Sequence, residues 1–303
     1  MATPELLLRI VGIVFPIFGI VAAGYAYARY KRRHGGIHMG FANQLNMDVF
    51  VPALVFAALA SKEFSLLDNL PLAAGAAVVV LGSGLLSWPL ARWLRVDAKT
   101  FVPPMMFTNS GNMGLPLLML AFGEKVLPLA VILFFVENVL HYSLGTWLLD
   151  HKARLLTLWR NPVIAASLAG MAVSLLQIPL WQPLYLGIKM LGDVSIPLLL
   201  FSLGVRLMES SLSDVRLGII GAVVCPLFGA LIAWSVAPLL GLQGVQADML
   251  LVFGALPPAV LNFVFAEKYR QEPERVASIV MIGNLGALVF VPLVLALVLR
   301  SGS

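Results

Sequence analysis

Long apolar runs separated by short polar stretches extend over the whole chain. A helix that crosses the hydrocarbon core of a bilayer needs about 20 predominantly apolar residues, and ten runs reach or approach that length. The pattern predicts an all-α polytopic membrane protein with ten transmembrane helices and short loops. The predicted helices, numbered 1 to 10, are residues 6–28, 42–61, 71–93, 101–122, 126–149, 161–179, 186–207, 217–240, 247–267 and 275–299.

Composition agrees with a bilayer as the main solvent. The chain is 60% hydrophobic and 12% charged, whereas soluble domains average about 25% charged residues. The formal net charge of +5 comes from basic residues in the short loops. This placement indicates membrane topology, so we expect a lipid bilayer and no nucleic acid as partner.

The loop charges also predict the orientation in the cell inner (plasma) membrane. Cytoplasmic loops of membrane proteins carry an excess of Lys and Arg. With both ends of the chain outside the cytoplasm, 15 of the 20 basic residues lie on the cytoplasmic side. These are Arg29, Lys31, Arg32, Arg33, Arg92, Arg95, Lys99, Lys152, Arg154, Arg160, Arg206, Arg216, Lys268, Arg270 and Arg275.

The two halves of the chain resemble each other at an offset of 145–146 residues. DVFVPALVF at 48–56 and DVSIPLLLF at 193–201 share five of nine positions. Other related pairs are Gly24 and Gly170, Gly75 and Gly221, and Asn138 and Asn284. Because each half has an odd number of spans, the second half enters the membrane from the opposite side. We therefore expect two inverted five-helix repeats, 1–149 and 161–303, joined by a cytoplasmic linker at 150–160.

Helix 4 contains a polar interruption that is unusual at membrane depth. Asn109, Ser110, Gly111 and Asn112 follow one another near its middle. Backbone groups released by such a break are tolerated where protein or a polar cavity satisfies them, and a half-helix N-terminus there favours an anion. The alternative is a kinked helix whose polar side chains bond to a neighbouring helix.

Helix 9 carries a second interruption at the corresponding place in the other half. Pro257 and Pro258 remove two backbone donors, and Asn262 follows four residues later. Broken helices in corresponding positions of two halves point to the binding site of a transporter. We predict that helices 4 and 9 cross at these breaks and that Asn262 faces the substrate.

Helix 5 contains a polar face. Glu137, Asn138 and His141 are three or four residues apart and share one side of the helix, followed by Tyr142. An intramembrane carboxylate is a functional candidate by default, so Glu137 is a candidate proton carrier with His141 beside it. The alternative is a polar clamp that holds helix 5 against the broken helix 4.

Four other polar residues are predicted to support the site. Asp48 and Asp193 are related by the repeat, and each is expected to cap or bond a break made by the nearby prolines 52 and 197. Asn138 and Asn284 are the second such pair.

Enzyme and metal motifs are absent from the sequence. It contains no HExxH, GxxxxGK[ST] or GxSxG pattern, and we expect no cofactor, no metal and no enzymatic activity. An intramembrane hydrolase using Ser110 and His141 is the alternative from that class.

Two stretches resemble motifs of the auxin efflux carrier family. NSGNMGLPLL at 109–118 resembles its fourth-helix motif, and ALPPAVLNFVFAEKY at 255–269 resembles its ninth-helix motif. The short connection between helices 5 and 6 is similar to that of bacterial members. By this resemblance Asn109 corresponds to the crossing asparagine and Tyr142 to a tyrosine near the substrate. Glu137 stands where plant carriers have glutamine.

The resemblance implies a fold like the sodium/bile-acid symporters. Helices 1, 2, 6 and 7 would form a scaffold, and helices 3–5 and 8–10 a transport domain that moves by an elevator mechanism, in a homodimer. The function expected is secondary active transport of small organic anions, carboxylates such as malate, malonate or auxin-like acids. The alternative is a membrane sensor or receptor that uses the same pocket without transport.

Overall fold

The computed structural model describes residues 4–32, 39–61, 65, 67–151, 160–209 and 212–301. Within these ranges the regular elements are helices. The α-helices are α1 Pro4–Arg32, α2 Gly40–Leu45, α3 Val51–Leu59, α4 Leu70–Leu94, α5 Ala98–Met106, α6 Leu115–Phe122, α7 Leu127–Leu140, α8 Thr146–Leu149, α9 Pro162–Leu175, α10 Gln182–Asp193, α11 Ser195–Glu209, α12 Val215–Val236, α13 Val245–Gly254, α14 Leu261–Tyr269 and α15 Pro273–Ser301. Wider π-helical turns are η1 Asn46–Phe50, η3 Ser110–Gly114 and η5 His141–Gly145, and short 3-10 turns are η2 Leu67–Asn69, η4 Glu124–Val126 and η7 Pro238–Leu240.

Apolar helices of membrane-spanning length confirm a polytopic membrane protein. In the described ranges seven helices are long and apolar enough to cross a bilayer, and three apolar helices are shorter, Ser110–Phe122, Pro162–Leu175 and Val245–Gly254. The first and last of these are short because helices 4 and 9 are interrupted. The helix predicted at 161–179 ends early, at Leu175, because Pro179 has no N–H and restricts the residue before it to extended backbone.

The distribution of side chains is reversed relative to a soluble protein. Large apolar side chains cover the outside, including Leu8, Phe15 and Leu85, each more than 70% exposed. Polar side chains such as Glu137 and Asn284 are buried in the centre. Exposed apolar surface of this extent requires an apolar surrounding such as lipid, and the buried polar groups mark the functional interior.

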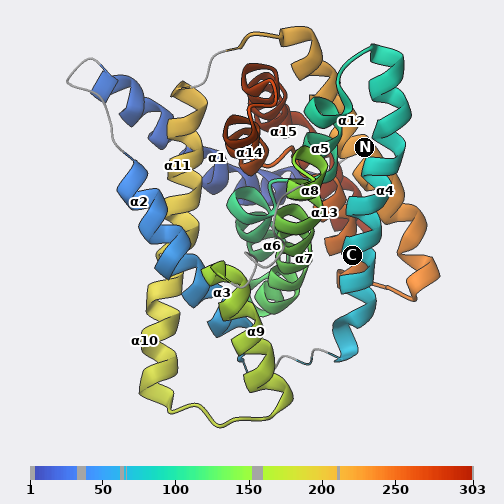
Figure 1. Cartoon of the computed structure of the whole chain (residues 1–303). Coiled ribbons are helices and arrows are strands. Elements are labelled where there is room, and N and C mark those ends of the chain that lie inside the picture. The colour runs from blue at the N-terminus through green and yellow to red at the C-terminus, as the bar shows by residue number, and fades with distance from the viewer. Residues whose placement is uncertain are drawn as a thin grey trace.

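The helices pack in two groups (Figure 1). In one group α1 packs against α11, while α3 packs against α9 and α10. In the other group α12 packs against α15, α13 and α4, and α4 packs against α5. Figure 1 shows α10 and α11 at one side and α4 and α12 at the opposite side, with α6 and α7 between them. The interrupted helices therefore lie at the boundary of the two groups.

Two glycines mark the same helix contact in each half of the chain. A Cβ on Gly24 of α1 would lie 2.1 Å from the Phe201 carbonyl oxygen of α11, and one on Gly170 of α9 would lie 3.1 Å from the Phe56 carbonyl oxygen of α3. Gly24 and Gly170 are related at 146 residues, and Phe56 and Phe201 at 145. The sequence similarity of the two halves therefore coincides with similar packing.

Part of the topology prediction concerns residues outside the described ranges. The predicted linker is described only at its ends, and Arg33, Lys62, Lys152 and Arg154 also lie outside these ranges.

Candidate functional site

The helix 4 interruption opens directly after α5. Phe107 is extended, with φ −104° and ψ 110°, and Asn109 precedes the π-helical turn η3, which continues into α6. Pro116 lies in the first turn of α6, where its missing N–H needs no partner. The polar cluster thus occupies the start of the helix Ser110–Phe122.

The helix 9 interruption meets the first one in an antiparallel bridge. Thr108 and Pro258 are bridge partners. The Asn109 N–H donates to the Pro257 carbonyl oxygen at 2.7 Å, and the Ala259 N–H donates to the Phe107 carbonyl oxygen at 2.9 Å. Each break therefore satisfies backbone groups that the other leaves open, as burial at membrane depth requires.

Three asparagine side chains complete this crossing. Asn109 Nδ2 donates to Asn284 Oδ1 at 2.7 Å, and Asn284 Nδ2 donates to the Pro258 carbonyl oxygen at 2.9 Å. Asn262 Nδ2 donates to the Phe107 carbonyl oxygen at 3.0 Å. All three side chains are buried. Asn284 comes from α15, so a third helix fixes both breaks.

Glu137 of α7 holds the first break from the other side. Its carboxylate accepts the Thr108 N–H and, at 3.3 Å, the Thr108 hydroxyl. Glu137 is 2% exposed. This geometry is the polar clamp between helices 5 and 4 that the sequence left as an alternative, and the clamp does not exclude a second role in proton transfer.

His141 and Tyr142 are packed among aromatic rings at the end of α7. His141 stacks on Phe107 with ring centroids 4.0 Å apart and meets the edge of Phe265 at 5.0 Å. Tyr142 meets the edge of Phe265 at 5.3 Å. The aromatic contacts fix both side chains close to the break.

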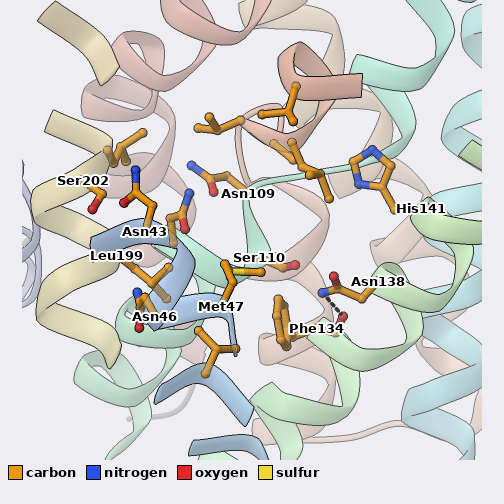
Figure 2. A pocket seen from close by; sticks show the side chains of 18 of the residues that line it. Asn43, Asn46, Met47, Asn109, Ser110, Phe134, Asn138, His141, Leu199 and Ser202 are labelled. Atoms are coloured by element: carbon orange, nitrogen blue, oxygen red, sulfur yellow. Dashed lines mark hydrogen bonds between the residues drawn. The ribbon is translucent and has the colours of Figure 1, made fainter. Parts of the chain in front are cut away.

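A cavity of about 350 Å³ lies beside the crossing. Its volume falls within the range usual for small-molecule sites. Figure 2 shows side chains of α2 and α11 on one side of it, those of α7 on the other, and Asn109 and Ser110 between them. The predicted residues that line it are Asn109, Ser110, Gly111, Asn112, Glu137, Asn138, His141 and Tyr142.

Other predicted residues lie elsewhere. Pro257 and Pro258 form the bridge without lining this cavity, Asn262 lines a separate small void with His141, and Asn284 supports the crossing from behind. The expected role of Asp193 at the proline break is wrong, because its carboxylate pairs with Lys189 at 3.2 Å on the exposed side of α10. Asp48 is exposed in the turn η1 rather than buried at a break.

The sequence analysis missed the face opposite the crossing. Asn43, Gln44 and Asn46 line the cavity from α2 and η1, and Ser202 and Arg206 line it from α11. Their spacing of three and four residues within apolar spans was an available signal. Arg206 is not in a cytoplasmic loop as predicted, because α11 continues to Glu209.

The described residues contain no group of three or more His, Cys, Asp or Glu side chains that could hold a metal ion. The polar atoms at the cavity are amides, hydroxyls, one carboxylate and one guanidinium. Such a set binds and orients a polar solute through hydrogen bonds.

Comparison with known proteins agrees with a transport function. The chain is 25% identical, over an alignment of 316 positions covering 97% of both chains, to a Rhizobium meliloti protein named "Putative malonate transporter". It is 23% identical to an "Uncharacterized transporter" of Methanocaldococcus jannaschii, with 95% of this chain and 94% of the relative covered. Over 43% of this chain and 24% of the relative it is 29% identical to auxin efflux carrier component 6 of Arabidopsis thaliana.

The family model described as membrane transport protein matches residues 9–157 and 151–295, nearly the whole chain. This match agrees with the resemblance of the two interrupted helices to auxin efflux carriers, and the relatives are transporters rather than enzymes. The chain therefore belongs to the membrane transport protein family that includes the auxin efflux carriers.

Proposed function

We propose that this transporter is a secondary active carrier of small organic anions and that it binds them at the crossing. The observation that carries the proposal is the convergence of two half-helix N-termini, those of Ser110–Phe122 and α14, on a bridge flanked by a cavity. The N-terminal end of a helix carries partial positive charge and unpaired N–H donors. A carboxylate is the common metabolite group that fits such donors.

A gradient drives this transport, because the sequence has no nucleotide-binding motif. Glu137 is the candidate coupling residue. It lines the cavity and bonds to the break that would hold the substrate. A proton taken up or released at Glu137 would change the hydrogen bond to Thr108 and so link the proton to the substrate site.

The proposed architecture is ten membrane crossings in two inverted five-helix repeats. The related contacts of Gly24 with Phe201 and of Gly170 with Phe56 support it. Helices 1, 2, 6 and 7 form the scaffold, and helices 3–5 and 8–10 carry the crossing in an elevator movement. The active protein is a homodimer in the inner (plasma) membrane with both ends outside the cytoplasm.

Carboxylates are the substrates to test first. The name of the Rhizobium meliloti relative refers to malonate, and the names of the plant relatives refer to auxin. The cavity has room for either class, since small-molecule sites begin at about 300 Å³. The proposed substrates are malate, malonate and auxin-like acids.

The experiment measures binding and flux separately. Purified protein is titrated with malonate, malate and indole-3-acetate by thermal shift, and flux of the binders is then measured in proteoliposomes. Asn109→Ala should weaken binding about tenfold or more, because it leaves a hydrogen-bonding site at membrane depth incomplete. Asn69→Ala is the matched control, since Asn69 is a buried, hydrogen-bonded asparagine away from the cavity. Binding without flux would favour a sensor, and binding that is insensitive to Asn109→Ala would reject the crossing as the site.

A further inference from the structure

A second, larger cavity adjoins the site. Its volume is about 800 Å³, and it shares four lining residues with the cavity at the crossing. These shared residues are Asn43, Leu203, Arg206 and Val260. They form a neck between the two cavities, so a solute in the larger cavity reaches the crossing by passing them.

Arg206 lies on the face of α11 that lines the inner cavity. Leu199, Ser202, Leu203 and Arg206 are three or four residues apart and line that cavity together. With a rise of about 1.5 Å per residue, Arg206 is about 6 Å further along the helix than Ser202. The helix therefore runs from the level of the crossing, which α11 contacts at η3, to the neck.

Arg206 is also the one basic residue among the described residues that line either cavity. The acidic lining residues are Glu137 at the inner cavity and Glu267 and Glu274 at the outer one. Glu137 is bonded to Thr108 of the break, and Glu267 and Glu274 are exposed. An anion that enters the inner cavity thus meets a single fixed guanidinium.

We propose that Arg206 binds a second carboxylate of the substrate, so that the carrier selects small dicarboxylates over monocarboxylates. This inference rests on the proposed function. One carboxylate occupies the crossing at Asn109 and η3, and the other pairs with Arg206 at the neck. Arginine suits this role because its planar guanidinium binds carboxylate through two parallel N–H···O hydrogen bonds.

The two ends of the site come from the two packing groups of helices. Asn109 belongs to the interrupted helix that packs with α4 and α7, and Arg206 belongs to α11, which packs with α1. A dicarboxylate would join the two groups through its two charged ends. A monocarboxylate would bind one group and leave the guanidinium at the neck without this partner.

The test compares anions that differ in one charge and little else. Inhibition of uptake into proteoliposomes is measured with succinate against succinamate and with malonate against malonamate, in which a neutral amide replaces one carboxylate. The wild-type protein should bind each dicarboxylate at least tenfold more tightly than its amide, which corresponds to a charge-assisted hydrogen bond of about 1.5–3 kcal/mol. Arg206→Gln should abolish that preference and leave binding of the amides within a factor of three.

Arg216→Gln is the matched control, because Arg216 is exposed at the start of α12 and lines neither cavity. It should keep the full preference for two charges. If Arg206→Gln does not fold, Arg206→Lys retains the charge without the bidentate geometry and should lower the preference several-fold.

The outcomes separate this inference from the proposed function. If neither the dicarboxylates nor the amides inhibit the wild-type protein, and no carboxylate binds, the anion-carrier proposal fails and this inference fails with it. If carboxylates bind and the wild-type ratio is near one, or if Arg206→Gln retains the wild-type ratio, only the role of Arg206 is overturned.

Discussion

Asn284→Ala should destabilise the protein far more than the same substitution at Asn138, its repeat-related position. Asn284 joins both interrupted helices to α15 through Asn109 and Pro258, at 2.7 and 2.9 Å. Asn138 Nδ2 donates to Phe134 of its own helix at 3.0 Å (Figure 2). The two asparagines thus share a place in the repeat and differ in what they hold together.

The magnitude follows from the groups that each substitution leaves buried. Asn284→Ala leaves the Asn109 Nδ2 donor and the Pro258 carbonyl oxygen without these partners, at about 1–3 kcal/mol each. Because Asn109 lines the cavity, water can compensate part of the loss, and we expect about 2–4 kcal/mol. For Asn138→Ala we expect about 1 kcal/mol, since the Phe134 carbonyl oxygen keeps its place in the helix.

The assay is thermal unfolding of the purified protein in one detergent. At about 2–4 °C per kcal/mol, Asn284→Ala should lower the apparent Tm by roughly 5–15 °C and Asn138→Ala by no more than about 4 °C. Asn284→Asp, which keeps the acceptor and loses the amide donor, should fall between them. Equal shifts for the two alanine variants would refute the argument that the crossing depends on α15.

Three further outcomes are expected. Glu137→Gln should keep substrate binding and lose the pH dependence of flux in vesicles, because a neutral amide keeps the hydrogen-bonding shape without titrating; identical pH profiles in the two proteins would remove Glu137 from coupling. Gly24→Ala should destabilise by about 1–3 kcal/mol, because a Cβ there would lie 2.1 Å from the Phe201 carbonyl oxygen, whereas Gly12→Ala in the same helix meets nothing within 4 Å and should be neutral or stabilising by up to about 1 kcal/mol. Cysteines introduced at Gly35 and Ser303, both outside the described residues, should label from opposite sides of intact cells; labelling from one side contradicts the predicted orientation.

The interruptions could be predicted from sequence because they arise from local chemistry. Consecutive prolines cannot continue a helix, and a run of small polar residues favours other backbone conformations. Asn109, Pro257 and Pro258 therefore indicated where the chain would break. Their partners across the crossing involve residues more than a hundred positions away, and only the folded structure gives those pairs.

The opposite wall of the cavity was not predicted, because its residues carry weaker local signals. Asn43, Asn46 and Ser202 are single polar residues within apolar helices, and such residues often bond to their own helix. Arg206 stands near the end of its span, where an arginine is usually a topology signal. Its inward position depends on the length of α11 and on the helices packed against it, which the local sequence does not determine.

The pairing of the two breaks has a consequence for the biogenesis of the protein. The Phe107 carbonyl oxygen waits for donors at Ala259 and Asn262, and Asn262 is 155 residues further along the chain. At a synthesis rate of 5–20 residues per second, that separation corresponds to about 8–30 s. During this interval the first interrupted helix has left the ribosome with buried backbone groups that its own half cannot satisfy. The nascent protein is therefore most vulnerable to quality-control proteases between the synthesis of its two halves, and this period ends when the second break is inserted.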